Sequence, residues 1–170
     1  MGQDKALLPW QGRTLLEHVA GEVLLAAGSV TIVGALEKYA VLGLPVIADR
    51  EAGLGPLGGI RTALEAGLAD WNLIVACDMP YVDSRLFQFL LAEAERTGAD
   101  CLMPVGQPLC AVYHLRCLPV LGDALGQGIR KVRQALEGLV VEQVQMDQVL
   151  CFQNMNTPAD WMAAKPVSTL

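Results

Sequence analysis

The sequence contains no apolar run near the roughly 18–20 residues that cross a bilayer, so it predicts no membrane-spanning helix. Charged residues are scarce, at 18%, and the net charge of −6 leaves no broad basic surface for nucleic acid. Hydrophobic residues make up 53% of the chain, which excludes a disordered protein. These values predict a globular protein whose partners are neither nucleic acid nor membrane.

The cysteines include no Cys-x-x-Cys pair, and their number, five, is odd. Most lie in apolar runs, so we expect buried thiols in a reducing compartment rather than disulfides or a zinc site. No signal peptide is visible, and we therefore expect a cytoplasmic protein. The cysteines are Cys77, Cys101, Cys110, Cys117 and Cys151.

Apolar strand-like segments alternate with segments of helical periodicity along the chain. This alternation predicts a three-layer α/β/α sandwich around a mostly parallel sheet. Strands of such a sheet are apolar on both faces, which accounts for a mean hydropathy of +0.39. No linker, repeat or low-complexity tract is present, so residues 1–170 are expected to form a single domain.

The segment Leu73–Pro80, Leu-Ile-Val-Ala-Cys-Asp-Met-Pro, is the sharpest local signal. A short apolar run predicts a strand buried on both faces, and Pro80 should end it near Asp78. Ligands of open α/β sheets bind at the carboxyl ends of the strands, so Asp78 is a candidate metal-holding carboxylate. The alternative is an aspartate that caps the following turn.

A second aspartate, Asp49, follows the short apolar segment Pro45–Ala48, and two aspartates at strand ends suggest a shared crevice. The glycine-rich segment Gly53–Ile60 is expected to be a loop that leads into a helix over Ile60–Leu68. Its glycines would let a ligand approach the backbone, although an ordinary tight loop explains them equally well.

Few cations are available to bind an anionic ligand. Lys5, beside the Gly2 turn, can reach phosphate oxygens, although a lone lysine is more often a solvated surface residue. Arg130, Lys131 and Arg133 form either one solvated helix face or a cationic rim for a phosphorylated substrate.

The two histidines favour structural roles. We expect His18 to be partly buried on a helix that Thr14 caps and Gly28 ends, and His114 to lie at a strand end. Near the C-terminus, Asn154 and Asn156 precede a Thr-Pro helix start, where their amides either cap the helix or contact a ligand.

Four motifs occur in a characteristic order: Met1–Leu8, Gly55–Ile60, Cys77–Pro80 and Asn154–Asp160. Together they closely resemble the molybdenum cofactor guanylyltransferases, the MobA family of Rossmann-like nucleotidyltransferases. The resemblance implies transfer of GMP from GTP to a molybdopterin-type cofactor, with or without molybdenum, and release of pyrophosphate. It also implies Mg²⁺ as cofactor and transient contact with other cofactor-biosynthesis or acceptor proteins.

The resemblance also assigns residues. Lys5 matches the lysine that binds the nucleotide phosphates, and Asp78 matches the aspartate that binds nucleotide and magnesium, so these two are the expected catalytic residues. Asp49 matches an aspartate of the nucleotide site. Asn156 falls on the pterin side, and Arg130 is a weaker match in that region.

The family begins with a strand and a glycine-rich loop, Leu-Ala-Gly-Gly-x-Ser-x-Arg, before Met-Gly-x-Asp-Lys, whereas this sequence starts at that methionine. That strand is central in the family's sheet, so we expect a truncated chain that lacks it. One rival interpretation is a non-catalytic nucleotide-binding remnant. Another is a molybdenum cofactor cytidylyltransferase, with the same fold and chemistry, although the Gly-Pro-Leu-Gly-Gly and Cys-Asp-Met-Pro motifs favour the guanine enzyme.

Overall fold

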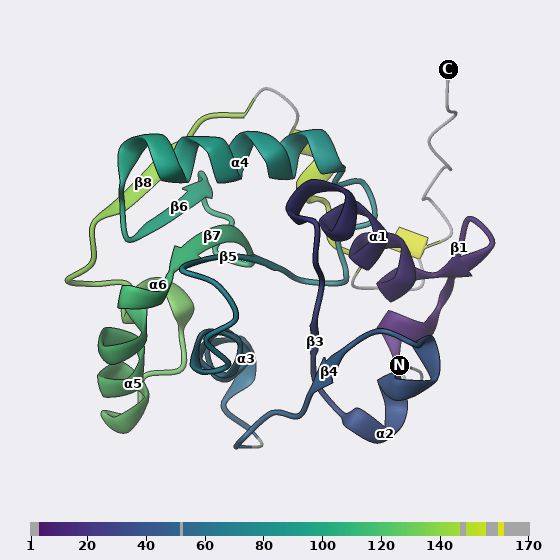
Figure 1. Ribbon diagram of the computed structural model, residues 1–170, viewed down its shortest axis with the longest axis horizontal. Coiled ribbons are helices and arrows are strands. Elements are labelled where there is room, and N and C mark those ends of the chain that lie inside the picture. The colour runs from purple at the N-terminus through teal and green to yellow at the C-terminus, as the bar shows by residue number, and fades with distance from the viewer. Residues whose placement is uncertain (1–3, 52, 147–148, 156–159, 162–170) are drawn as a thin grey trace.

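The computed structural model describes residues 4–51, 53–146, 149–155 and 160–161 (Figure 1). The helices are α1 (Leu15–Ala27), α2 (Leu36–Tyr39), α3 (Gly55–Glu65), α4 (Ser84–Thr97), α5 (Leu118–Gly126) and α6 (Val132–Ala135). The strands are β1 (Pro9–Trp10), β2 (Arg13–Thr14), β3 (Ile32–Val33), β4 (Val46–Ile47), β5 (Trp71–Val75), β6 (Cys101–Pro104), β7 (Cys110–His114) and β8 (Val141–Val144).

Four strands form the central sheet in the order β5-β7-β6-β8. β7 is antiparallel to both β5 and β6, and β8 is parallel to β6, so β5, β6 and β8 share one direction. The connection between β6 and β7 spans only a short turn, which is why these two strands pair as a hairpin. The prediction of a mostly parallel sheet is therefore confirmed, with β7 as the reversed strand.

Helices cover both faces of this sheet (Figure 1), because its strands alternate their side chains between two hydrophobic clusters. Val112 of β7 packs in the cluster that contains Leu15 of α1 and Phe87 of α4. The adjacent Tyr113 packs in the cluster that contains Leu57 of α3 and residues of α5 and α6. The three-layer α/β/α arrangement is thereby confirmed.

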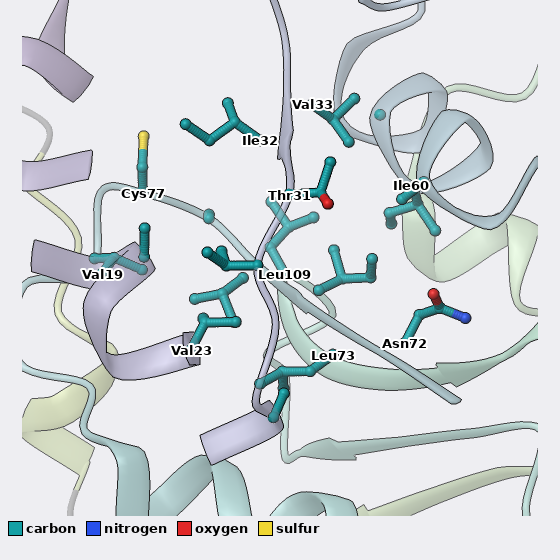
Figure 2. A pocket seen from close by; sticks show the side chains of 18 of the residues that line it. Val19, Val23, Thr31, Ile32, Val33, Ile60, Asn72, Leu73, Cys77 and Leu109 are labelled. Atoms are coloured by element: carbon teal, nitrogen blue, oxygen red, sulfur yellow. The ribbon is translucent and has the colours of Figure 1, made fainter. Parts of the chain in front are cut away.

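β3 and β4 form a separate parallel pair, with Ile32 opposite Val46. A cavity of about 1190 Å³ lies between this pair and β5, and Figure 2 shows Ile32 and Leu73 on its wall. Among the described residues, no strand pairing joins β3 to β5. The gap corrects the prediction that β5 is buried on both faces, because every residue of β5 is only half-buried.

Thr14 and Gly28 define the ends of α1 as predicted, and a side chain also caps the start of α4. Thr14 and Glu17 form a capping box at the start of α1: the Glu17 amide donates to Thr14 Oγ1 (3.2 Å) and the Thr14 amide to Glu17 Oε2 (2.7 Å). Gly28 ends that helix in the left-handed conformation, with φ 73°. Asp83 caps α4 by accepting from the Leu86 amide at 2.9 Å.

The glycine-rich segment is not the loop that we expected, because α3 already begins at Gly55. Pro56 stands in the first turn, where its missing N–H costs no hydrogen bond and its fixed φ suits a helix. Gly58 is required by packing, since a Cβ there would lie 2.5 Å from Leu54 Cβ. The glycines therefore let the first turns of a helix pack tightly.

All five cysteines are thiols rather than disulfides, and four of them are buried as predicted, whereas Cys77 is only half-buried. Within the described parts of the chain, no helix is both long enough and apolar enough to cross a membrane.

Candidate active site

The candidate site lies just beyond the carboxyl end of β5. The strand stops at Val75, three residues earlier than we predicted, after which the Ala76 amide donates to Leu109 O at 2.8 Å. The chain then turns through Cys77 and Asp78. Asp78 thus lies at the end of the strand where ligands of open α/β sheets bind, in the turn that follows it.

The carboxylate of Asp78 is half-buried and lines the large cavity. Burial raises the pKa of Asp78, and a backbone hydrogen bond together with the positive charge of Lys5 offsets only part of that rise. Its Oδ1 is buried and has no hydrogen-bond partner among the described residues. A buried carboxylate oxygen left without a partner is costly unless a ligand or a metal ion satisfies it.

The turn that carries Asp78 is held from two sides. The Met155 amide donates to Asp78 O at 2.9 Å, which places Asn154 and Met155 beside the turn. His18 Nε2 lies 2.9 Å from Pro80 O, and because a carbonyl oxygen only accepts, Nε2 carries the hydrogen. The expected structural role of His18 is confirmed, and its partner fixes the backbone next to Asp78.

Lys5 is the first residue of a short 3₁₀ turn, Lys5–Leu7, which Asp4 caps by accepting from the Ala6 amide at 3.1 Å. Lys5 lines the same cavity as Asp78, and its positive charge offsets part of the rise that burial causes in the pKa of Asp78 and of Cys77. The structure therefore brings together the lysine and the aspartate that the sequence selected as catalytic residues.

The cavity has two parts of different character. Most of its wall is apolar and comes from α1, β3 and β5, as Figure 2 shows for Val19, Val23, Ile32 and Leu73. The polar side chains Asp4, Lys5, Tyr39, Asp78 and Asn154 also line it, and Thr31, Asp70, Asn72 and Glu95 line other parts of it. Chemistry on a phosphate substrate would take place near Lys5, since Lys5 is the one lysine or arginine among the described lining residues.

Other predicted residues lie apart from this site. Asp49 is exposed beyond β4 and does not line the cavity. Arg130 is also exposed, and its Nη1 donates to Leu125 O (3.1 Å) and Ile129 O (3.0 Å) at the end of α5. Asn156 lies outside the described residues. The ligand contacts expected of these three residues stay predictions.

The remaining basic and histidine candidates have structural contacts. Arg133 Nη2 donates to Gly106 O at 2.9 Å and so supports the β6–β7 turn. His114 Nδ1 accepts from the Arg116 amide at 3.1 Å, and its ring meets the edge of Trp71 at 4.6 Å between centroids. Because Trp71 begins β5, His114 lies at the end of that strand away from Asp78.

The sequence analysis did not identify two of the site residues, Asp4 and Tyr39. Asp4 could have been found, because an aspartate directly before a short apolar segment is a common capping residue. Its second partner, Tyr39, follows 35 positions later on a short helix, and no local pattern links the two.

A family profile described as "MobA-like NTP transferase domain" matches residues 1–144. The chain belongs to this family. A probable molybdenum cofactor guanylyltransferase of Carboxydothermus hydrogenoformans is 32% identical over 170 residues, which cover 95% of this chain and 86% of that protein. The Deinococcus radiodurans protein of the same name is 35% identical, over 94% of this chain and 84% of its own length. The resemblance drawn from the four motifs is thus confirmed.

Solved structures agree with this family. The molybdopterin-guanine dinucleotide biosynthesis protein A from Archaeoglobus fulgidus superposes with a TM-score of 0.80 at 29% identity, over 95% of this chain and 89% of that one. The 2-C-methyl-D-erythritol 4-phosphate cytidylyltransferase of Thermus thermophilus gives 0.74 at 21% identity, over 94% and 91% of the two chains, and supports the fold alone. The expected Rossmann-like nucleotidyltransferase fold is confirmed.

Proposed function

We propose that this chain transfers GMP from GTP to a molybdopterin-type cofactor and releases pyrophosphate. The observation that carries the proposal is a buried oxygen of Asp78 that has no partner among the described residues, on the cavity that Lys5 also lines, in a chain of this family. The Carboxydothermus relative named for this activity supports the choice of substrates. Asp49 on the nucleotide, Asn156 and Arg130 on the pterin and the single-domain organisation belong to the same proposal.

The donor set at Asp78 fits Mg²⁺, which prefers oxygen ligands and is often held by one or two carboxylates together with substrate phosphates and water. The described residues contain no group of three or more metal-ligating side chains, so substrate and water would complete the coordination. When bound, the ion neutralises phosphate charge. Asp78 would hold it, and Lys5 would place a second positive charge on the triphosphate.

The reaction follows from this placement. The terminal phosphate of the pterin substrate attacks the α-phosphorus of GTP in line. A new P–O bond forms while the bond to the α,β-bridging oxygen breaks, and pyrophosphate leaves with those electrons. The attacking phosphate is already anionic, so the site needs no strong base. Lys5 and Asp78 therefore act by positioning and charge neutralisation. The five cysteine thiols support a reducing, cytoplasmic setting.

Turnover with Mg²⁺, GTP and molybdopterin, with the dinucleotide product separated by chromatography, tests the proposal. CTP replaces GTP in a parallel reaction, and a preference for CTP would identify a cytidylyltransferase instead. The same assay is run on a version extended at its N-terminus by the family's strand and glycine-rich loop. If neither version forms a dinucleotide although GTP binds, the chain is a nucleotide-binding protein and the proposed activity is wrong.

A further inference from the structure

The hydroxyl of Tyr39 connects α2 to the turn that carries Lys5. It donates to Asp4 Oδ2 at 2.9 Å, and the same oxygen accepts from Lys38 Nζ at 3.2 Å. The other oxygen of that carboxylate accepts from the Ala6 amide within the turn. One carboxylate thus ties the first turn of the described chain to a helix more than thirty residues later, and Figure 1 shows α2 beside the N-terminus.

The ring of Tyr39 is itself fixed. It is half-buried and packs over Gly34, where a Cβ would lie 2.8 Å from Tyr39 Cε2. Burial, followed by the hydrogen bond to Asp4, raises the pKa of Tyr39 well above its usual value. The phenol therefore remains a hydrogen-bond donor over the whole physiological pH range.

We propose that Tyr39 is a positioning residue for GTP binding, which holds Asp4 and thereby sets the place of Lys5 relative to Asp78. This inference rests on the proposed function, since it acts through the phosphate contact of Lys5. Tyr39, Lys5 and Asp78 line one cavity, so a shift of the turn would move the ammonium group relative to the carboxylate.

Lys38 provides a matched comparison on the same oxygen. Its side chain is 58% exposed, and an exposed ion pair contributes little because solvent screens it. Tyr39 is half-buried, and hydrogen bonds between a neutral donor and a charged acceptor are stronger when water is kept away. Removal of the phenol should thus disturb Lys5, whereas removal of the Lys38 ammonium should not.

Isothermal titration calorimetry, which measures the Kd for GTP in the presence of Mg²⁺, tests the inference. The proteins compared are the unsubstituted 170-residue chain, Tyr39→Phe, Lys38→Ala, Lys5→Ala and the Tyr39→Phe/Lys5→Ala double variant. We expect Tyr39→Phe to raise the Kd for GTP about tenfold, the factor that corresponds to about 1.4 kcal/mol. Lys38→Ala should change it less than about twofold. In the Lys5→Ala background, Tyr39→Phe should have no further effect, because the contact through which it acts is gone.

Each other outcome is decisive. An equal loss of affinity on Tyr39→Phe with and without Lys5 would indicate a purely structural effect and overturn the inference. GTP binding weakened by Lys5→Ala but unchanged by Tyr39→Phe would overturn it while leaving the proposed function intact. Absence of GTP binding by the unsubstituted chain would overturn both. If Tyr39→Phe does not fold, Asp4→Asn takes its place, and unchanged GTP affinity there would overturn the inference.

Discussion

The imidazole of His18 donates from Nε2 to the carbonyl oxygen of Pro80 across 2.9 Å, which links α1 to a turn 62 positions later. This bond is buried, and the Pro80 oxygen lies two residues after Asp78. The helix that the capping box starts therefore supports the backbone of the candidate metal site.

Replacement of His18 by leucine should destabilise the protein by about 1–3 kcal/mol, because the Pro80 oxygen would stay buried without a donor. His18→Gln, whose amide can still donate, should recover at least half of that loss. Urea unfolding followed by circular dichroism measures both. Equal stability of the leucine and glutamine variants would contradict the importance of this bond.

Asp78→Asn should lower magnesium-dependent turnover by about 10²–10³-fold, the scale of losing one charge-stabilising group in an active site. The fold should survive, since burial penalises the charged form of Asp78 and asparagine removes that charge. Turnover is compared with a thermal melt, and Asp70→Asn serves as control because Asp70 lines the same cavity at the other end of β5. Loss of the fold would instead favour the turn-capping role.

Gly58→Ala should destabilise the protein by about 1–3 kcal/mol, since the new Cβ would meet Leu54 Cβ at 2.5 Å and force the start of α3 to shift. Gly59→Ala, one position further, has nothing within 4 Å of its added Cβ and should be neutral or stabilising by up to about 1 kcal/mol. Thermal unfolding of the two variants separates the effect of packing on stability from the effect of helix propensity. Similar effects of both changes would show that Leu54 can move aside freely.

The ion pair of Arg116 with Asp100 should make stability depend on pH in the acid range. Arg116, together with the Val140 amide at 2.8 Å, lowers the pKa of Asp100 below its ordinary 3.8. A carboxylate whose pKa is lowered on folding stabilises the protein above its unfolded pKa, and that contribution disappears as the pH falls through its folded pKa. The difference in unfolding free energy between the unsubstituted chain and Asp100→Asn should therefore be largest near neutral pH and shrink below pH 3.8. A constant difference across a pH series of urea titrations would exclude this linkage.

The parts of the fold that local side-chain chemistry determines were predictable. Thr14 caps α1 and Gly28 ends it, as the sequence predicted. The motif residues Lys5 and Asp78 also meet on one cavity as expected.

What the sequence could not supply depends on contacts between distant segments. Helix α3 begins at Gly55 despite the low helix propensity of glycine, and its Leu57 and Ile60 are buried in one cluster with residues of α5. The incomplete burial of β5 reflects the gap next to β3, which is a property of the whole sheet. The hydrogen bond from Tyr39 to Asp4 joins two short elements that have no hydrophobic periodicity, so no local sequence pattern predicts it.

The gap between β3 and β5 has a mechanical consequence. Without a strand pairing across it among the described residues, side chains and helices connect the β3–β4 pair to the four-stranded sheet, and α3 contacts both β3 and β5. Main-chain amides on the facing edges should exchange their hydrogens with solvent faster than those of β7, which is paired on both sides. Strand edges without a pairing partner also pair readily with other chains. Concentrated solutions of these 170 residues should therefore self-associate through the facing edges of β3 and β5.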